Sequence, residues 1–228
     1  TGEASYLQGL EASAKNNIAP YAWPNTYSDF SPWMKFDFAH NAPDGVPTAM
    51  TAEWRAFFTR IGDELAALNS KMPYRMSWPR YQDFWMAWGA GNFCNRARAL
   101  LIAYAIDPKP DYRDAAVQNI DYMLGTNPMG LSWTTGIGQV YPVDIQHANS
   151  ENDGILDPVP GITIYGVTGG IYARLRNQGW SCPDGKGGKT IFYAPPEGGY
   201  PFFRAWSPHP TENTAQCEFT IAETVAGT

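Results

Sequence analysis

Apolar residues recur at helical spacing in the first half of the chain. One stretch places them at i, i+3, i+4, i+7, i+11 and i+14, which is a single face of an amphipathic helix with Thr51 as the expected N-cap. A second stretch predicts a helix over residues 92–106, and a third predicts one over 112–124 with Asp111 as its N-cap and Asp114 in its first turn. The first face consists of Trp54, Phe57, Phe58, Ile61, Leu65 and Leu68, and the second helix is expected to bury Phe93, Ala97, Leu100, Leu101 and Tyr104.

The rest of the chain shows weaker patterns. Residues 3–15 read as a short helix, whereas residues 20–50 are rich in proline and aromatic residues without a sustained period and predict an ordered loop. The β-branched and glycine-rich stretch 162–173 predicts a short β-hairpin, and residues 215–225 resemble the start of a helix. Paired helices with short connections predict a mostly α protein built from helical hairpins, with functional loops at one end.

A long loop follows the third helix. Gly125 can take the left-handed conformation that ends a helix, and Asn127-Pro128 prevents its continuation. Polar residues then continue to Gly154, and loops of this length in a compact domain usually build a site. This one carries one of the three histidines of the chain, and also Asp144, Glu151 and Asp153.

Composition narrows the classes of partner. The net charge of -6 and the lack of any Lys/Arg cluster argue against nucleic acid, and no apolar run reaches the roughly 18 residues of a membrane span. Aromatic residues make up 14% of the chain, which suits either a carbohydrate-facing groove or an aromatic core. Cys94, Cys182 and Cys217 lack metal-ligand spacing, and a bridge between the last two is one option.

Several short motifs follow one another along the chain, at residues 85–89, 120–130, 132–138, 147–154, 158–161 and 218–221. Taken in this order, they resemble the C-terminal half of the catalytic domain of glycoside hydrolase family 9, over about residues 78–228. The family contains endoglucanases and related β-1,4-glucan hydrolases, so the resemblance implies part of an (α/α) barrel of six helical hairpins and a secreted, extracellular enzyme.

The resemblance also implies a general acid. The family places it in a pattern that Cys217-Glu218-Phe-Thr-Ile matches, which makes Glu218 the candidate. Such an acid needs a raised pKa, and the neighbours Cys217, Phe219 and Ile221 could supply it by desolvation. The alternative role for Glu218 is a carboxylate that stabilises a helix N-terminus. Glu223 lies five residues further on, about 140° around a helix at 100° per residue, so both carboxylates would not face one cleft.

In the family, the long loop carries a pattern like Pro-His-x-Arg-x-Ser-x-x-Asp-Gly, whose histidine and arginine contact the sugar. Gln146 occupies the histidine position and Ala148 the arginine position, so His147 is expected to take over the sugar contact from the next position. A hydrogen bond that orders the loop is the other role for His147, and the same choice holds for Asp153. Further candidate substrate contacts are Ser150, Trp133, Tyr141, Arg204 and Trp206, although each aromatic could equally be core or rim.

Glycoside hydrolysis needs a second carboxylate to activate water. The family supplies it from an Asp-Ala-Gly-Asp-like motif in its N-terminal half, and that string is absent from these 228 residues. We therefore expect a single partial catalytic domain over residues 1–228, inactive alone, whose partners are a β-glucan and the missing half of an inverting enzyme. A non-catalytic glycan-binding or structural module is the alternative. No cofactor is expected, and calcium is implied by the resemblance only, since no Asp-x-Asp-x-Asp-Gly loop occurs.

Overall fold

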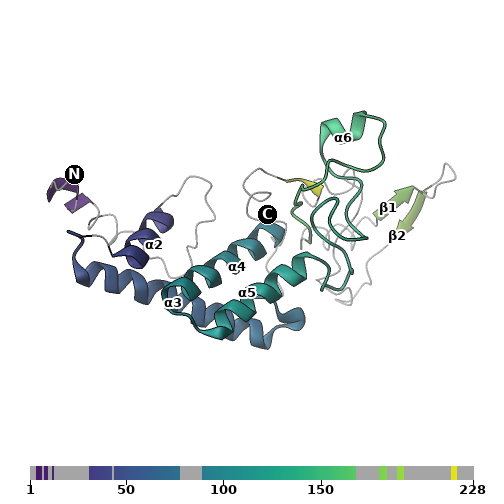
Figure 1. Ribbon diagram of the computed structural model, residues 1–228. Helices are drawn as coiled ribbons and strands as arrows, with labels where there is room; N and C mark the ends of the chain where they lie inside the picture. The colour runs from purple at the N-terminus through teal and green to yellow at the C-terminus, as the bar shows by residue number, and fades with distance from the viewer. Residues whose placement is uncertain are drawn as a thin grey trace.

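The computed structural model describes residues 4–6, 8–9, 12, 31–42, 44–77, 89–167, 180–183, 189–192 and 217–219, and this part is mostly helical (Figure 1). No helix in it is long and apolar enough to cross a membrane. The helices are α2 (Ser31–Asn41), α3 (Thr48–Lys71), α4 (Gly89–Ile106), α5 (Pro110–Met123) and α6 (Ala148–Asn152), with a 3-10 turn at Pro73–Arg75 and strands β1 (Trp180–Pro183) and β2 (Lys189–Phe192).

Helix α3 agrees with the predicted amphipathic helix except at its start. It begins at Thr48 after Pro47, and Thr51 lies inside the helix, where its hydroxyl donates to the Thr48 carbonyl at 2.9 Å. The predicted N-cap at Thr51 is therefore wrong. The buried face already includes Met50, so packing extends the helix by a turn beyond the periodic stretch.

Helix α2 corrects the prediction of a loop over residues 20–50. Its sequence has little helical period, and its position depends on tertiary contacts with α3. The Phe36 ring meets Phe58 edge-on with centroids 6.2 Å apart. The Arg55 guanidinium donates to the carbonyls of Ala39 at 2.7 Å and Ile106 at 2.9 Å, which joins the last turns of α2 and α4 to α3. Such contacts override weak local preference.

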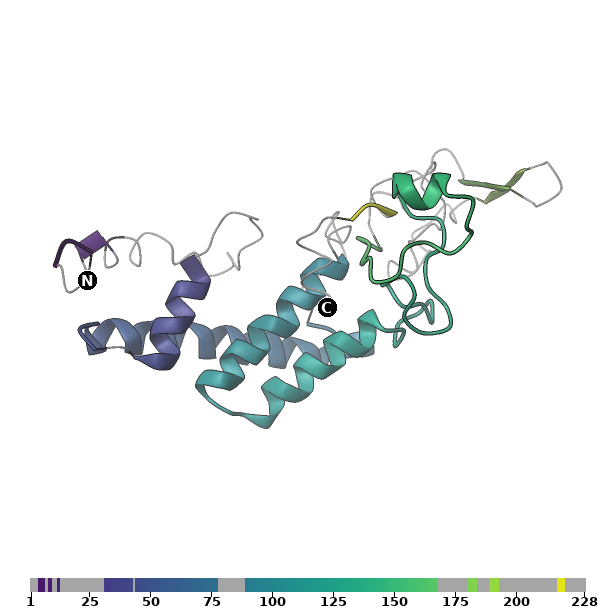
Figure 2. The same cartoon turned by 45° about the horizontal axis from the view of Figure 1, so that its top comes forward.

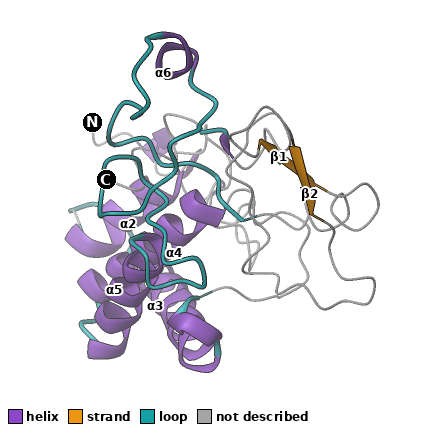
Figure 3. Ribbon diagram, turned by 90° about the vertical axis from the view of Figure 1, so that its right-hand side faces the viewer, coloured by secondary structure: helices purple, strands orange, loops and turns teal. Residues whose placement is uncertain are grey.

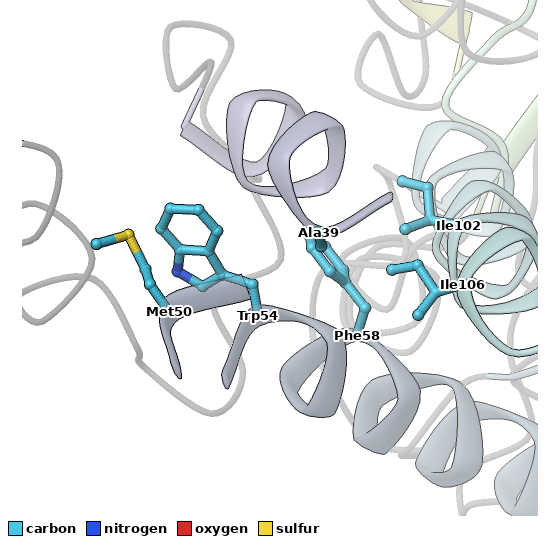
Figure 4. Packing of buried hydrophobic residues seen from close by; sticks show 6 residues of the cluster. All are labelled: Ala39, Met50, Trp54, Phe58, Ile102 and Ile106. Carbon is cyan, nitrogen blue, oxygen red and sulfur yellow. The ribbon is translucent and has the colours of Figure 1, made fainter. Parts of the chain in front are cut away.

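Two apolar clusters hold the helices together. The first joins α2, α3 and α4 (Figure 4), and the second joins α4 and α5 with partly buried residues of α3 packed against it. Gly62 lets α3 approach closely, because a Cβ there would lie 2.5 Å from the Ala103 Cβ. The first cluster comprises Ala39, Met50, Trp54, Phe58, Ile102 and Ile106, and the second comprises Ala97, Leu100, Ala103, Tyr112, Ala115 and Ala116.

The α4–α5 hairpin follows the predicted boundaries closely, with two corrections. Helix α5 starts at Pro110, whose ring presets the φ angle of a first helical residue, so Lys109 holds the N-cap position and Asp111 lies in the first turn. Asp114 accordingly falls beyond that turn. The predicted burial of Leu101 is wrong, because this side chain is 45% exposed. The Phe93 side chain lies outside the described part of the chain.

A loop-rich region occupies one end of the helices, with α6 projecting away from them (Figures 1 and 3). The predicted hairpin over 162–173 is wrong for its described half. Residues 162–167 form no strand, and Thr163 instead makes an isolated antiparallel bridge to Thr134. The antiparallel hairpin of the structure is β1–β2, in which Trp180 pairs with Phe192. The extended segment around Thr163 therefore pairs with Thr134, a distant residue of the same loop, and not with an adjacent strand.

The predicted helices near the two ends of the sequence are described only in part. Residues 4–6, 8–9 and 12 of the predicted helix over 3–15 are helical. Of the predicted 215–225 helix, only Cys217–Phe219 belongs to the described residues, and this short segment lies beside the loop region in both Figure 1 and Figure 2.

Candidate functional site

Asn127 organises the exit from α5 into the long loop. Its side-chain amide donates to the carbonyls of Tyr122 and Leu131, each at 2.8 Å, and its oxygen accepts from the backbone N–H groups of Met129 at 3.0 Å and Leu131 at 3.4 Å. The residue is buried. The helical pattern of backbone hydrogen bonds ends at Gly125, which has φ +124°. The Asn127 side chain supplies hydrogen-bond partners for backbone groups before and after this glycine.

Thr135 joins the first part of the loop to its return segment. Its backbone N–H donates to the Ile162 carbonyl at 2.9 Å, and its hydroxyl donates to the Val159 carbonyl at 2.6 Å while accepting from the Ile162 N–H at 2.9 Å. The next residue, Gly136, has φ +70°, and a Cβ there would lie 2.5 Å from the Pro160 Cβ. These contacts make residues 133–136 and 159–164 a fixed base for the polar segment between them.

His147 stands at the start of α6 and caps it. Its side chain accepts from the Ser150 N–H, with 3.4 Å between Nδ1 and the nitrogen, and Nδ1 lies 2.8 Å from the Ser150 hydroxyl oxygen. That same oxygen accepts from the Val159 N–H at 3.1 Å. The loop-ordering role considered for His147 is therefore present in the structure, and it holds the ring in one orientation.

The Cys217–Phe219 segment packs against this loop. The Gln146 N–H donates to the Cys217 carbonyl at 3.1 Å, and the Tyr165 N–H donates to the Glu218 carbonyl at 2.9 Å. The Phe219 ring meets the His147 ring at 5.7 Å in an edge-to-face arrangement. Two segments far apart in sequence are thereby held side by side, with Glu218 between two residues that contact the His147 loop.

The residues around Glu218 differ in burial. Cys217 is fully buried, and burial together with the Asp144 carboxylate raises the pKa of its thiol to about 12. Glu218 and Phe219 are half-buried. Among the residues that the structure describes, no ion pair involves the Glu218 carboxylate.

The other predicted contacts divide into available and occupied side chains. Gln146 is exposed, and Asp153, also exposed, accepts from the Ile155 N–H at 2.8 Å, which is the loop-ordering role. The half-buried Tyr141 donates to Asp157 at 3.3 Å, and the charge of that carboxylate raises the pKa of the phenol. Trp133 is only 2% exposed and packs against Gly166, so the structure shows the core position that the sequence left open for it beside a substrate contact. Arg204 and Trp206 lie outside the described residues.

The residues that hold the loop in shape carry no signal in the sequence. Asn127 stands there only as part of a helix-breaking pair, and Thr135 and Thr163 belong to no predicted site. Side-chain hydrogen bonds of this kind join distant segments, so no periodic signal reports them. Among the described residues, no group of three or more His, Cys, Asp or Glu side chains is arranged to hold a metal ion.

Residues 1–174 match the family model described as glycosyl hydrolase family 9, which is more than half of the chain. The chain belongs to this family. The predicted resemblance over about 78–228 was therefore right in family but different in extent, because the match begins at residue 1 and includes the His147 loop, whereas Glu218 lies beyond it.

Similar proteins agree with this assignment. A xyloglucan-specific endo-beta-1,4-glucanase of Bacteroides ovatus is 35% identical over 172 residues, which cover 75% of this chain and 29% of that protein. A cellodextrinase of Butyrivibrio fibrisolvens is 32% identical over 101 residues, which cover 44% of this chain and 18% of that one. The chain therefore spans less than a third of the length of these relatives.

The fold is shared with solved structures. A single mutant of the thermostable endoglucanase from Alicyclobacillus acidocaldarius superposes with a TM-score of 0.76 at 21% identity, covering 99% of this chain and 38% of that one. A metagenome-derived family 9 endoglucanase superposes with a TM-score of 0.75 at 19% identity, over 99% and 36%. The predicted fold class, a mostly α chain that forms part of an (α/α) barrel, is confirmed.

Proposed function

We propose that this chain is the part of a longer secreted glycoside hydrolase that carries its general acid, Glu218, and that the complete enzyme cleaves β-1,4-glucan with inversion. The observation that carries the proposal is the attachment of Glu218 to the histidine-bearing loop, through the main-chain hydrogen bonds of Cys217 to Gln146 and of Glu218 to Tyr165. Membership of family 9 and the lengths of the relatives support it.

The chemistry assigns two roles across the scissile bond. Glu218, protonated, gives its proton to the leaving glycosidic oxygen, while a carboxylate from outside this chain removes a proton from the attacking water. Inversion requires the two carboxyl groups to lie about 6.5–9.5 Å apart, so that water fits between them and the sugar. His147 and Gln146 are neighbours on the loop and can donate to sugar hydroxyls, while the Ser150 hydroxyl oxygen lies 2.8 Å from His147 Nδ1. The chain alone should be inactive because it lacks the second carboxylate.

The first test compares two glutamates in the complete protein. Glu218→Gln keeps the shape of the side chain but cannot release a proton, so sugar release from soluble β-glucan should fall by about 10²–10⁴-fold. Glu223→Gln, five residues away, serves as the matched control and should retain activity. Equal rates for the Glu218→Gln enzyme and the unaltered enzyme would remove Glu218 from the mechanism.

A second measurement separates acid catalysis from a structural effect. In an aryl glucoside with a strongly acidic phenol, the phenolate leaves without being protonated. The Glu218→Gln enzyme should therefore cleave such a substrate at close to the rate of the unaltered enzyme. The first anomer detected by proton NMR should be the α form, as inversion demands. If the complete protein binds β-glucan but the unaltered enzyme releases no sugar, the chain belongs to a glycan-binding module instead.

A further inference from the structure

The hydrogen bonds around His147 define which ring nitrogen carries its hydrogen. The Ser150 backbone N–H can only donate, and it points at Nδ1, so Nδ1 acts as an acceptor. The Ser150 hydroxyl lies 2.8 Å from the same nitrogen. A neutral imidazole has one donor and one acceptor nitrogen, so an accepting Nδ1 leaves the hydrogen on Nε2.

Val159 holds the Ser150 hydroxyl oxygen from a second side. Its backbone N–H donates to this oxygen at 3.1 Å, and the hydroxyl hydrogen remains available to point at the accepting His147 Nδ1, 2.8 Å away. The chain of donors therefore runs from Val159 to Ser150 to His147. Because residue 159 lies on the return segment fixed by Thr135, this arrangement is anchored in the base of the loop.

The other ring nitrogen remains available. Among the described residues, Nε2 of His147 has no hydrogen-bond partner, and the half-buried ring packs edge-to-face against Phe219, next to Glu218. We propose that Ser150 is a positioning residue that holds His147 in its Nε2–H form, so that the ring donates to a hydroxyl oxygen of a glucan bound beside Glu218. This inference rests on the proposed function.

A donor on His147 matters because this chain departs from the family pattern at the neighbouring position. Ala148 stands where the resembled pattern has arginine, so this position supplies no charged donor. A neutral N–H donor of fixed direction suits the uncharged hydroxyl of a glucose unit, and its hydrogen bond is worth about tenfold in affinity. Rotation of the ring, or a shift of its hydrogen to Nδ1, would remove that donor.

The experiment uses the complete enzyme and two substitutions at one position. Ser150→Ala removes the hydroxyl and should raise KM about tenfold with a smaller change in kcat, while Ser150→Thr, which keeps a hydroxyl, should restore KM to within about twofold. Asn152→Ala on the same short helix is the matched control. Within the described part of the chain the Asn152 side chain donates only to the Ala148 carbonyl, so this substitution should leave KM unchanged.

Nitrogen-15 NMR of the His147 ring supplies a readout that loss of structure alone would not mimic. In the unaltered protein at neutral pH, Nδ1 should show the shift of an unprotonated nitrogen and Nε2 that of a protonated one. Ser150→Ala keeps only the longer backbone contact at 3.4 Å and loses the hydroxyl contact at 2.8 Å, so it should increase the Nδ1–H population. A ring already in the Nδ1–H form overturns the inference, whether or not Ser150→Ala folds. So does an unchanged KM for Ser150→Ala in an enzyme that Glu218→Gln inactivates, and in that case the proposed function survives. If the unaltered protein hydrolyses nothing, the inference falls together with the proposed function.

Discussion

The helices α3 to α5 and the loop over residues 124–167 are held by different forces. The two clusters between the helices consist of hydrophobic residues and alanines, Trp54, Leu100 and Ala103 among them, and the buried polar Asn119 of α5 belongs to neither cluster. In the loop, buried polar residues such as Asn127 and Thr135 each make several hydrogen bonds. We therefore expect the helical region to accept the exchange of one apolar side chain for another of similar size, whereas the loop should depend on individual donors and acceptors.

This difference has a consequence for function. Packed helices provide a rigid support, and the candidate site lies on the segment whose shape is determined by single polar side chains. A substitution in the helices should mainly lower the free energy of unfolding, while one in the loop should mainly displace His147 and the segment around Glu218. The following four experiments test that separation, from the largest expected effect on stability to the smallest.

Removal of Trp54 should have the largest effect. Its side chain is 1% exposed at the centre of the first cluster, so Trp54→Ala should lower the free energy of unfolding by about 3–5 kcal/mol, measured by denaturant titration. The indole Nε1 has no hydrogen-bond partner among the described residues, so Trp54→Phe should recover much of the loss. Arg60→Ala, on the exposed side of the same helix, is the control and should change stability by less than about 1 kcal/mol. A loss of similar size for Arg60→Ala would contradict the division between core and surface.

Loss of the Asn127 amide should affect the loop more than the helices. Asn127→Ala leaves two carbonyls and two N–H groups without this partner, so we expect a loss of about 2–3 kcal/mol. Hydrogen exchange should accelerate over residues 124–140 with little change in α3. Asn127→Asp keeps the accepting oxygen but loses the amide donor, so its loss of stability should lie between those of the unaltered protein and Asn127→Ala. Uniform acceleration across α3 to α5 would show that helices and loop unfold as one unit.

Gly62→Ala tests close packing against helix propensity. Alanine alone would stabilise a helix by about 1 kcal/mol, but its Cβ would lie 2.5 Å from that of Ala103 and 2.9 Å from the Tyr112 ring. Overpacking should prevail, with a net loss of about 1–2 kcal/mol in chemical denaturation. Ala67→Gly, exposed on the same helix, measures the propensity term alone and should destabilise by about 1 kcal/mol. Stabilisation by Gly62→Ala would mean that α3 can move away from α4.

Titration of Cys217 should give the smallest effect, visible only at alkaline pH. Burial raises the pKa of this thiol from 9.0 to about 12, so above pH 9 the unfolded chain ionises it while the folded chain does not. The stability that is fully present below pH 9 is therefore lost as pH rises towards 12, by about 1 kcal/mol at pH 10. Cys217→Ala should show a shallower decline of the unfolding free energy between pH 8 and 10 than the unaltered protein. Parallel curves would contradict a raised thiol pKa.

Much of the helical region could be predicted from the sequence, because periodicity directly reports which face of a helix is buried. The stripe from Trp54 to Leu68 located α3, and proline and glycine positions bounded α5 to within a few residues. Helix α2 was missed for a physical reason: it has little periodic face of its own, and its contacts with Phe58 and Arg55 come from another element.

For the site, the sequence alone determined the chemistry that is available: the carboxylate of Glu218, the imidazole of His147 and a polar loop that no helix could continue through. Only the tertiary structure decided that Cys217–Phe219 lies against that loop, that Trp133 is buried beneath Gly166, and that Ser150 and Val159 orient the histidine. The reason is that periodicity records burial along one element, whereas a hydrogen bond between distant segments leaves no regular trace in the order of residues.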